Sequence, residues 1–209
     1  FKYSAMLQSR RRLGLTATLV REDKKEDEVF ALVGPKKADA PWRDLEHQGW
    51  IAKACCTELR VPLVGNEMYR YADSDKRQRF YLAANNENKH DVINDLLEKH
   101  SQEQILIIGM FIDQLREIAA KLRVPIITGE TAHEQRELLF ARFRTREIRI
   151  MVCSKIANFA IDLPDASVAI QISGTFGSRQ EEAQRLGRIL RPKSGLNQAH
   201  FYTIVSKDT

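Results

Sequence analysis

The sequence holds few of the residues on which disulfide scaffolds and metal centres depend. Three of its 209 residues are cysteines; Cys55 and Cys56 are adjacent, and Cys153 lies far from both. This spacing fits neither a disulfide framework nor a zinc site, so we expect all three thiols to be small buried hydrophobes. The five histidines are scattered along the chain, and we predict no metal site and no nucleophilic catalytic centre.

Three further absences narrow the classes of function open to the chain. No glycine is followed by lysine, so the Gly-Lys-Ser/Thr loop that cradles nucleotide phosphates is missing. No apolar run has the length of a membrane span and no signal-peptide pattern is present, so we expect an intracellular protein with no membrane partner. The 33 basic and 28 acidic residues give a net charge of +5, which is compatible with a nucleic-acid partner.

Apolar strands and helices alternate regularly through the rest of the chain. Strands are predicted at 57–63, 104–109, 124–128, 148–152, 168–172 and 199–205, and helices at 92–99, 111–122 and 131–143. Thr131 and Glu134 have the spacing of a capping box, which would open the third of these helices. Continuous apolar strands separated by helices indicate an α/β fold with a parallel sheet covered on both faces. Ligands of such sheets bind at the carboxyl ends of the strands.

Residues 178–191 are predicted to form a short helix with both ends marked. Ser178 is a good amino-terminal cap, and a proline closes the segment. Gln184, Arg188 and Arg191 share one face, roughly 140° from the apolar stripe of the same helix. Guanidinium groups bind phosphate oxygens in pairs and stay charged, so this face suits phosphate recognition. A solvated basic helix face has the same pattern.

The string Gln-Arg-Leu-Gly-Arg-Ile-Leu-Arg at 184–191 resembles the last motif of superfamily 2 helicases, and with its flank at 174–183 it is similar to the XPB family. The resemblance implies a RecA-like (P-loop NTPase-type) fold, in which this chain would be the second helicase motor domain. It also implies that this domain supplies arginine fingers and nucleotide contacts. The catalytic candidates are Arg188, Arg191 and Gln184, and the nucleotide-binding candidates are Asp162 and Gly187.

The resemblance extends to residues 15–23, which read Leu-Thr-Ala-Thr-Leu-Val-Arg-Glu-Asp. In the family, a Thr-Ala-Thr motif here couples the nucleotide state to the bound strand, and an Arg-Glu-Asp motif is associated with opening duplex DNA. Taken alone, the first is also typical of a hydroxyl-rich turn and the second of a solvated loop, and residues 13–18 are predicted to begin as a short buried strand. The DNA-binding candidates are Thr16, Thr18, Arg21, Glu22 and Asp23.

Two loops that follow predicted strands supply further candidates for contact with the DNA backbone. The first precedes a helix, whose free N–H groups favour a phosphate, although an ordinary helix start has the same residues. The second offers hydroxyl, amine and amide groups, which are sensible phosphate contacts. The resemblance favours DNA contact in both. The candidates are Thr128, Gly129 and Thr131 in the first loop, and Ser154, Lys155 and Asn158 in the second.

The chain is predicted to comprise the end of one domain and most of another. We assign residues 1–40 to the last part of a first RecA-like domain, 41–54 to a linker and 55–209 to the second RecA-like domain. Tyrosines and arginines interleave at about 66–88, where the XPB family has a thumb-like helical insertion thought to grip DNA; a helical hairpin packed on its own domain has the same composition. The acidic residues at 27–30 are read as a helix start rather than a magnesium-binding box, because they follow a polar stretch.

Together these patterns predict a carboxyl-terminal motor-domain fragment of an XPB-family ATP-dependent DNA helicase or translocase, acting in DNA repair or transcription. ATP and Mg²⁺ would be held mostly by the missing first domain, so this chain alone is expected to be inactive. Its partners would be DNA, that amino-terminal helicase domain, and a repair nuclease or transcription and repair factors; in a prokaryote it would lie in the cytoplasm, on the nucleoid. Two alternatives remain: a stand-alone nucleic-acid or protein-binding module without ATPase activity, and a duplex translocase that does not separate strands.

Overall fold

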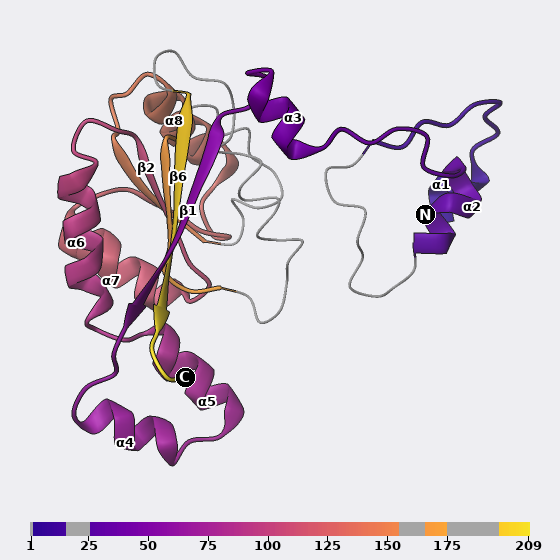
Figure 1. The fold of residues 1–209 in the computed structure, drawn as a ribbon. Helices are drawn as coiled ribbons and strands as arrows, with labels where there is room; N and C mark the ends of the chain where they lie inside the picture. Colours follow the sequence, from indigo (N-terminus) through magenta and orange to yellow (C-terminus); the bar gives the residue numbers. More distant parts are fainter. Residues whose placement is uncertain (1, 16–25, 155–165, 175–196) are drawn as a thin grey trace.

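A six-stranded sheet forms the centre of the molecule (Figure 1). The computed structural model describes residues 2–15, 26–154, 166–174 and 197–209. The sheet order is β1-β6-β5-β2-β4-β3, and all the strand pairs are parallel. The strands are β1 (Lys53–Val61), β2 (Ile105–Ile108), β3 (Ile126–Ile127), β4 (Ile150–Cys153), β5 (Val168–Gln171) and β6 (Gln198–Ser206). The predicted parallel α/β sheet is therefore confirmed.

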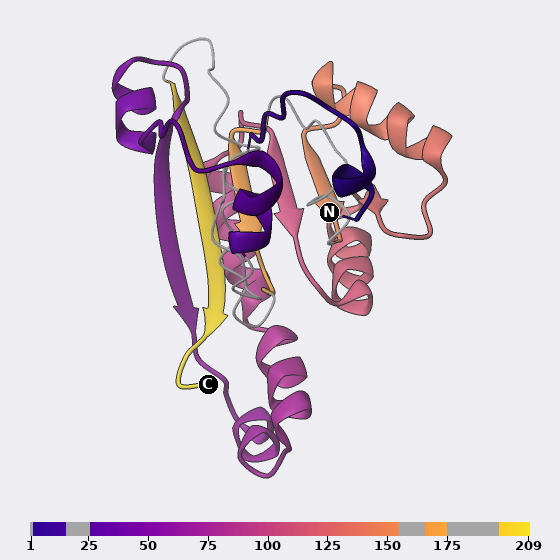
Figure 2. The same ribbon diagram turned by 90° about the vertical axis from the view of Figure 1, so that its right-hand side faces the viewer.

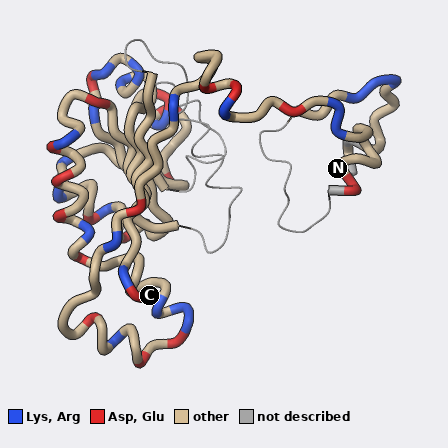
Figure 3. The backbone as a smooth tube through the Cα atoms, viewed as in Figure 1, with Lys and Arg blue, Asp and Glu red and all other residues tan. Residues whose placement is uncertain are grey.

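Helices cover both faces of the sheet, so the central strands β2 and β4 are apolar throughout. The four residues of β2 alternate in direction: Ile105 and Ile107 pack with α6 (Lys89–Lys99) and α7 (Ile112–Leu122), whereas Leu106 and Ile108 pack with α8 (His133–Arg144). Burial of each such side chain contributes about 1.5–3 kcal/mol. Figure 3 shows the consequence for charge: acidic and basic residues of both signs lie on the outer helices, and few lie along the strands.

The helix α8 begins differently from the sequence-based expectation. Its first residue is His133, and its cap residue Ala132 makes no side-chain hydrogen bond. The hydroxyl of Thr131 instead accepts a hydrogen bond from the backbone N–H of Thr128 at 2.9 Å. The predicted capping box of Thr131 and Glu134 is therefore wrong, because Thr131 lies before the cap position and its side chain closes the preceding turn.

The amino-terminal region contains α1 (Lys2–Met6) and α2 (Glu26–Val33), and α2 confirms the helix expected at 27–30. The buried strand expected at 13–18 is wrong in its described part, because residues 13–15 form no strand and Leu13 and Leu15 are 84 % and 86 % exposed. No described strand lies beside these residues to pair with their backbone. Further along, α3 (Trp42–His47) is followed by Gly49 with a φ of 73°. The domain limits at 40 and 54 stay a prediction.

A helical hairpin, α4 (Asn66–Ala72) and α5 (Lys76–Ala84), follows β1 and extends beyond the carboxyl edge of the sheet (Figures 1 and 2). No residue of α4 is buried, and Met68 and Tyr69 are exposed. The hairpin packs on the domain through α5, where the rings of Phe80 and Tyr81 lie 5.6 Å and 5.2 Å from that of Phe111. Both sequence-based interpretations thus keep a basis, since one end packs on the domain and the rest is exposed.

The three cysteines differ from one another in burial. Cys153 is fully buried in β4, Cys55 is half-buried and Cys56 is exposed. The expectation of three buried thiols is wrong for Cys56, because β1 lies at an edge of the described sheet and one of its faces is open to solvent. Separately, none of the described helices is both long enough and apolar enough to cross a membrane.

Candidate functional site at the carboxyl edge of the sheet

Because the six strands are parallel, the loops that follow them meet at one edge of the sheet. Four predicted site residues lie within the described part of the chain, and this edge brings them together. Ile127 of β3 pairs with Cys153 of β4, so the next residues, Thr128 and Ser154, lie at neighbouring strand ends. The backbone N–H of Ser154 donates to the carbonyl oxygen of Ile127 at 2.9 Å. The two loops chosen from sequence are therefore adjacent.

The turn at 128–131 is held by its own hydroxyl groups. In addition to the bond from Thr128 to Thr131, the N–H of Glu130 donates to the Thr128 hydroxyl oxygen at 3.3 Å, and the N–H of Thr131 donates to the Thr128 carbonyl at 3.3 Å. Thr128 is buried and Gly129 is exposed at the tip. The threonines therefore shape the turn, while Gly129 is the member that can meet a large partner.

The amino end of α8 adds positive potential beside this turn. Since Ala132 offers no side-chain acceptor, the first N–H groups of this 12-residue helix are not capped by it. Uncapped N–H groups and the helix dipole together favour an anion. The exposed carboxylate of Glu130 pairs with Arg116 at 2.8 Å close by, so one acid and one base are already present at the edge of this surface.

The remaining sequence-predicted site residues lie outside the described residues. They are Thr16, Thr18, Arg21, Glu22, Asp23, Lys155, Asn158, Asp162, Gln184, Gly187, Arg188 and Arg191. The predicted helix at 178–191 lies outside them too. The structure does show where that segment is attached: Gly174 follows β5 at the carboxyl edge, and Asn197 precedes the neighbouring strand β6.

Sequence reasoning missed three buried polar side chains at the same edge, which we call the Lys89 cluster: Lys89, Gln114 and Ser173. The Lys89 ammonium donates to the carbonyl oxygens of Ala84 at 3.1 Å and Ile172 at 2.8 Å. Burial lowers the pKa of Lys89 to about 8. Lysine is almost always exposed, so its place at the start of α6 gave no signal; the polar run at 85–89 between two helices was the available hint.

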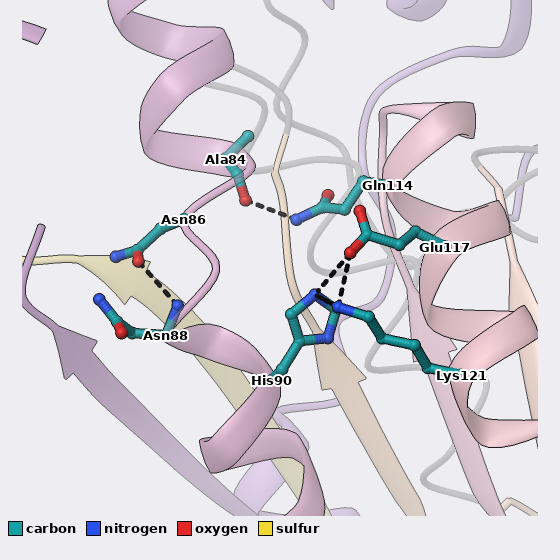
Figure 4. A network of polar contacts seen from close by, with 7 residues as sticks. All are labelled: Ala84, Asn86, Asn88, His90, Gln114, Glu117 and Lys121. Atoms are coloured by element: carbon teal, nitrogen blue, oxygen red, sulfur yellow. Dashed lines mark hydrogen bonds and ion pairs between the residues drawn. The ribbon is translucent and has the colours of Figure 1, made fainter. Parts of the chain in front are cut away.

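Beside the Lys89 cluster lies a hollow of about 200 Å³ lined by residues of both charges, among them Lys89, Asp113 and Glu117. Figure 4 shows polar contacts at its wall, where His90 of α6 faces Glu117 of α7. The Glu117 carboxylate accepts from Lys121 at 2.6 Å and lies 3.4 Å from the His90 ring nitrogen. The hydrogen bond from Lys121 is the main reason that the pKa of Glu117 is lowered. Within the described ranges, no three histidine, cysteine or acidic side chains are grouped in a way that could hold a metal ion.

The ERCC3/RAD25/XPB C-terminal helicase family matches residues 45–209. The chain is 53 % identical over 209 residues to the DNA 3'-5' helicase XPB of Mycobacterium tuberculosis. The alignment covers all of this chain and 38 % of that protein. It is 42 % identical over 204 residues to the general transcription and DNA repair factor IIH helicase/translocase subunit XPB of Antonospora locustae, covering 95 % of this chain and 30 % of that one. The chain thus spans well under half of the length of these relatives.

Solved structures agree on the fold. S. cerevisiae Dbp5 bound to RNA and ADP BeF3 superposes with a TM-score of 0.63 at 13 % identity, covering 92 % of this chain and 44 % of that one. The C-terminal domain of the DEAD-box protein Dbp5 gives a TM-score of 0.52 at 18 % identity, covering 60 % and 74 %. Together with the parallel sheet, these matches confirm the RecA-like architecture.

Proposed function

This chain belongs to the ERCC3/RAD25/XPB C-terminal helicase family, and from that membership we propose that it is the second RecA-like motor domain of an ATP-dependent DNA helicase or translocase. Residues 55–209 would form that domain, 41–54 the linker, and 1–40 the last part of the first motor domain. Cycles of closing and opening between two such domains move the loops that hold the nucleic acid along the strand.

One observation carries the DNA-binding part of the proposal: the turn at 128–131 and Ser154 lie at neighbouring strand ends, beside the uncapped amino end of α8. We assign the contact with the DNA backbone to Gly129 and the first N–H groups of α8, with Ser154 and the following Lys155 and Asn158 on the next strand. Thr128 and Thr131 act by holding the turn, since their hydroxyl oxygens already accept hydrogen bonds within it. Backbone N–H groups and helix amino ends are common phosphate contacts.

The nucleotide part of the proposal rests on the family motif at 184–191. Arg188 and Arg191, with Gln184, would reach the ATP phosphates across a cleft whose other wall belongs to the first motor domain. Asp162 and Gly187 would lie near the nucleotide. ATP and Mg²⁺ would be held mostly by that first domain. An arginine finger that meets the charge of the moving phosphoryl group is worth about 10³–10⁵ in rate.

Residues 15–23 complete the proposed DNA-handling set. Thr16 and Thr18 would couple the nucleotide state to the bound strand, and Arg21, Glu22 and Asp23 would act where the duplex opens. The exposed aromatic and methionine side chains of α4 are a second surface that could grip DNA. Partners beyond DNA would be the first motor domain and repair or transcription factors. Strand displacement on a forked duplex separates a helicase from a translocase that leaves the strands paired.

A charge change beside the proposed DNA contact tests it directly. Glu130→Gln removes a carboxylate next to the turn and releases Arg116 from an ion pair of 2.8 Å. If DNA phosphates lie there, DNA affinity of the chain rises about fivefold, which is ~1 kcal/mol, and the salt dependence steepens by about one counterion. Fluorescence anisotropy with a labelled oligonucleotide at several salt concentrations measures both.

Glu147→Gln is the matched control. Glu147 is also exposed and also pairs with an arginine, Arg142, at 2.6 Å, but it follows α8 at the opposite end of the helix. Glu147→Gln changes the charge by the same amount but away from the carboxyl edge, so the affinity for DNA should equal that of the unaltered chain. Equal effects of the two substitutions on DNA affinity, or no effect of Glu130→Gln, would contradict the proposed DNA contact at this turn.

A further inference from the structure

The last turn of α5 does not satisfy its own carbonyl groups. The final carbonyls of a helix lack partners within it and must be paired by other groups. The Ala83 carbonyl accepts from the Ser206 hydroxyl of β6 at 2.7 Å, and the Ala84 carbonyl accepts from Lys89 and from the side-chain amide of Gln114. The end of the hairpin is thus held by side chains from β6, α6 and α7.

The same side chains hold the loop that follows β5. Lys89 donates to Ile172, and the Ser173 hydroxyl donates to the side-chain carbonyl of Gln114 at 3.1 Å. The N–H of Met110, after β2, donates to the Ser173 oxygen at 2.8 Å. The Lys89 cluster therefore joins three points: the end of the hairpin, the loop after β2, and the loop after β5 from which residues 175–196 continue.

The hairpin itself is built as one unit. Arg79 of α5 donates to the last carbonyls of α4, at 3.0 Å to Tyr71 and 2.7 Å to Ala72, and its guanidinium lies 5.6 Å from the Tyr71 ring centre. In α5 only Leu82 and Ala84, both near the end, are buried. A force or a ligand acting on the exposed part of the hairpin would therefore reach the domain through the last turn of α5.

We propose that Lys89 is a positioning residue that fixes the α4–α5 hairpin to the end of β5, so that DNA bound by the hairpin keeps one geometry relative to the loops that follow β2 and β5. The inference rests on the proposed function, because it takes the hairpin as a DNA-binding surface of a DNA-stimulated motor. A buried cation is costly unless it is well paired, and Lys89 is paired with two carbonyls from elements far apart in sequence. Its charge also complements the negative end of the α5 dipole.

The test is ATP hydrolysis by the complete motor protein that contains this chain, measured with and without DNA. Lys89→Met keeps the length and apolar stem of the side chain but removes both hydrogen bonds. Basal turnover and the KM for ATP should stay within about twofold, whereas the DNA-stimulated kcat should fall about tenfold. A loss of this order is expected when reacting groups are misplaced by less than about 1 Å. Gln114→Met, which removes the other donor to Ala84, should give the same pattern and carries the test if Lys89→Met does not fold.

Two controls separate positioning from stability. Lys121→Met makes the same substitution on the exposed side of α7, where the lysine pairs with Glu117, and should leave the stimulation by DNA unchanged. Leu97→Ala weakens the core under α6 without touching the Lys89 cluster, and should lower the melting temperature but not the stimulation. The inference is overturned if Leu97→Ala loses stimulation to the same extent, or if Lys89→Met and Gln114→Met retain it. If the unaltered protein shows no DNA-stimulated hydrolysis, the proposed function itself fails.

Discussion

Lys89 is a charged side chain at a position that is 4 % exposed, and its two carbonyl partners do not remove the cost of its burial. The ammonium form is disfavoured enough that its pKa falls from 10.5 to about 8. Since the unfolded chain keeps the ordinary pKa, the unfolded state binds more protons than the folded state between these two values. The free energy of unfolding must therefore rise with pH over that interval.

We expect this rise to be about 2 kcal/mol between pH 7.5 and 10 for the contribution of Lys89 alone. Urea denaturation of the unaltered chain and of Lys89→Met at both pH values isolates the Lys89 contribution. The other titrating groups contribute equally to the two proteins, so they cancel when the free energies of unfolding are subtracted. The destabilisation caused by burying the charged Lys89 is fully present below about pH 8, and it disappears as the pH rises to 10.5 and above. Identical pH dependence of the two proteins would mean that Lys89 keeps an ordinary pKa in the fold.

The residues that could be chosen from sequence are those whose type alone suggests chemistry. Thr128, Gly129 and Ser154 were found because they follow apolar strands, and the parallel register does place them together. Lys89 could not be found in this way, since its burial depends on Ala84 and Ile172, which are distant from one another in the chain. A lysine at the start of a helix is most often solvated.

The turn from β2 into α7 shows how one small residue lets two elements meet. A Cβ atom on Gly109 would lie 2.9 Å from Leu115 Cδ2 of α7 and 3.0 Å from both Ile172 Cγ1 and Ser173 Oγ. Leu115 is fully buried, so it has no room to move away. The glycine therefore allows α7 and the end of β5 to approach the end of β2 closely.

Gly109→Ala should lower the free energy of unfolding by about 1–3 kcal/mol, the usual cost of overpacking a well-filled site. Chemical denaturation followed by circular dichroism measures it. Gly174→Ala is the control, because a Cβ atom there would closely approach one side-chain amide, that of Gln171 at 3.0 Å. A smaller loss at Gly109 than at Gly174 would show that the close packing at the β2 end is not as described.

The elements were predictable where their apolar pattern was long and regular, and less so at their ends. The strands and α6, α7 and α8 follow from runs that need burial on both faces of a parallel sheet. The start of α8 was not predictable, because the Thr131 hydroxyl could accept a hydrogen bond either from the first turn of the helix or from the turn before it. In the structure it accepts from the backbone N–H of Thr128, within the preceding turn. The strand expected at 13–18 depended on neighbours that the described residues do not supply.

Taken as a whole, the described part of the molecule gathers its candidate site residues at the carboxyl edge of the sheet. The parallel strands bring the 128–131 turn, Ser154 and the Lys89 cluster to the same side of the sheet, and the hairpin extends beyond that side (Figure 2). The family could be recognised from sequence because a motif at 184–191 constrains eight consecutive residues, far more than a fold requires. Which side chains of that motif would touch ATP depends on how two domains are placed relative to one another, and a single sequence does not contain that placement.

Arg188 is proposed to supply, with Arg191, the arginine side of a nucleotide site shared between two motor domains. The most direct measurement is ATP turnover and ATP affinity of the complete motor protein carrying Arg188→Ala. If Arg188 acts on the charge that develops during phosphoryl transfer, kcat should fall about 10³-fold or more while the dissociation constant for ATP rises less than tenfold. Equal losses in turnover and in affinity would contradict the account, since Arg188 would then be a binding residue that does no more for the transition state than for bound ATP.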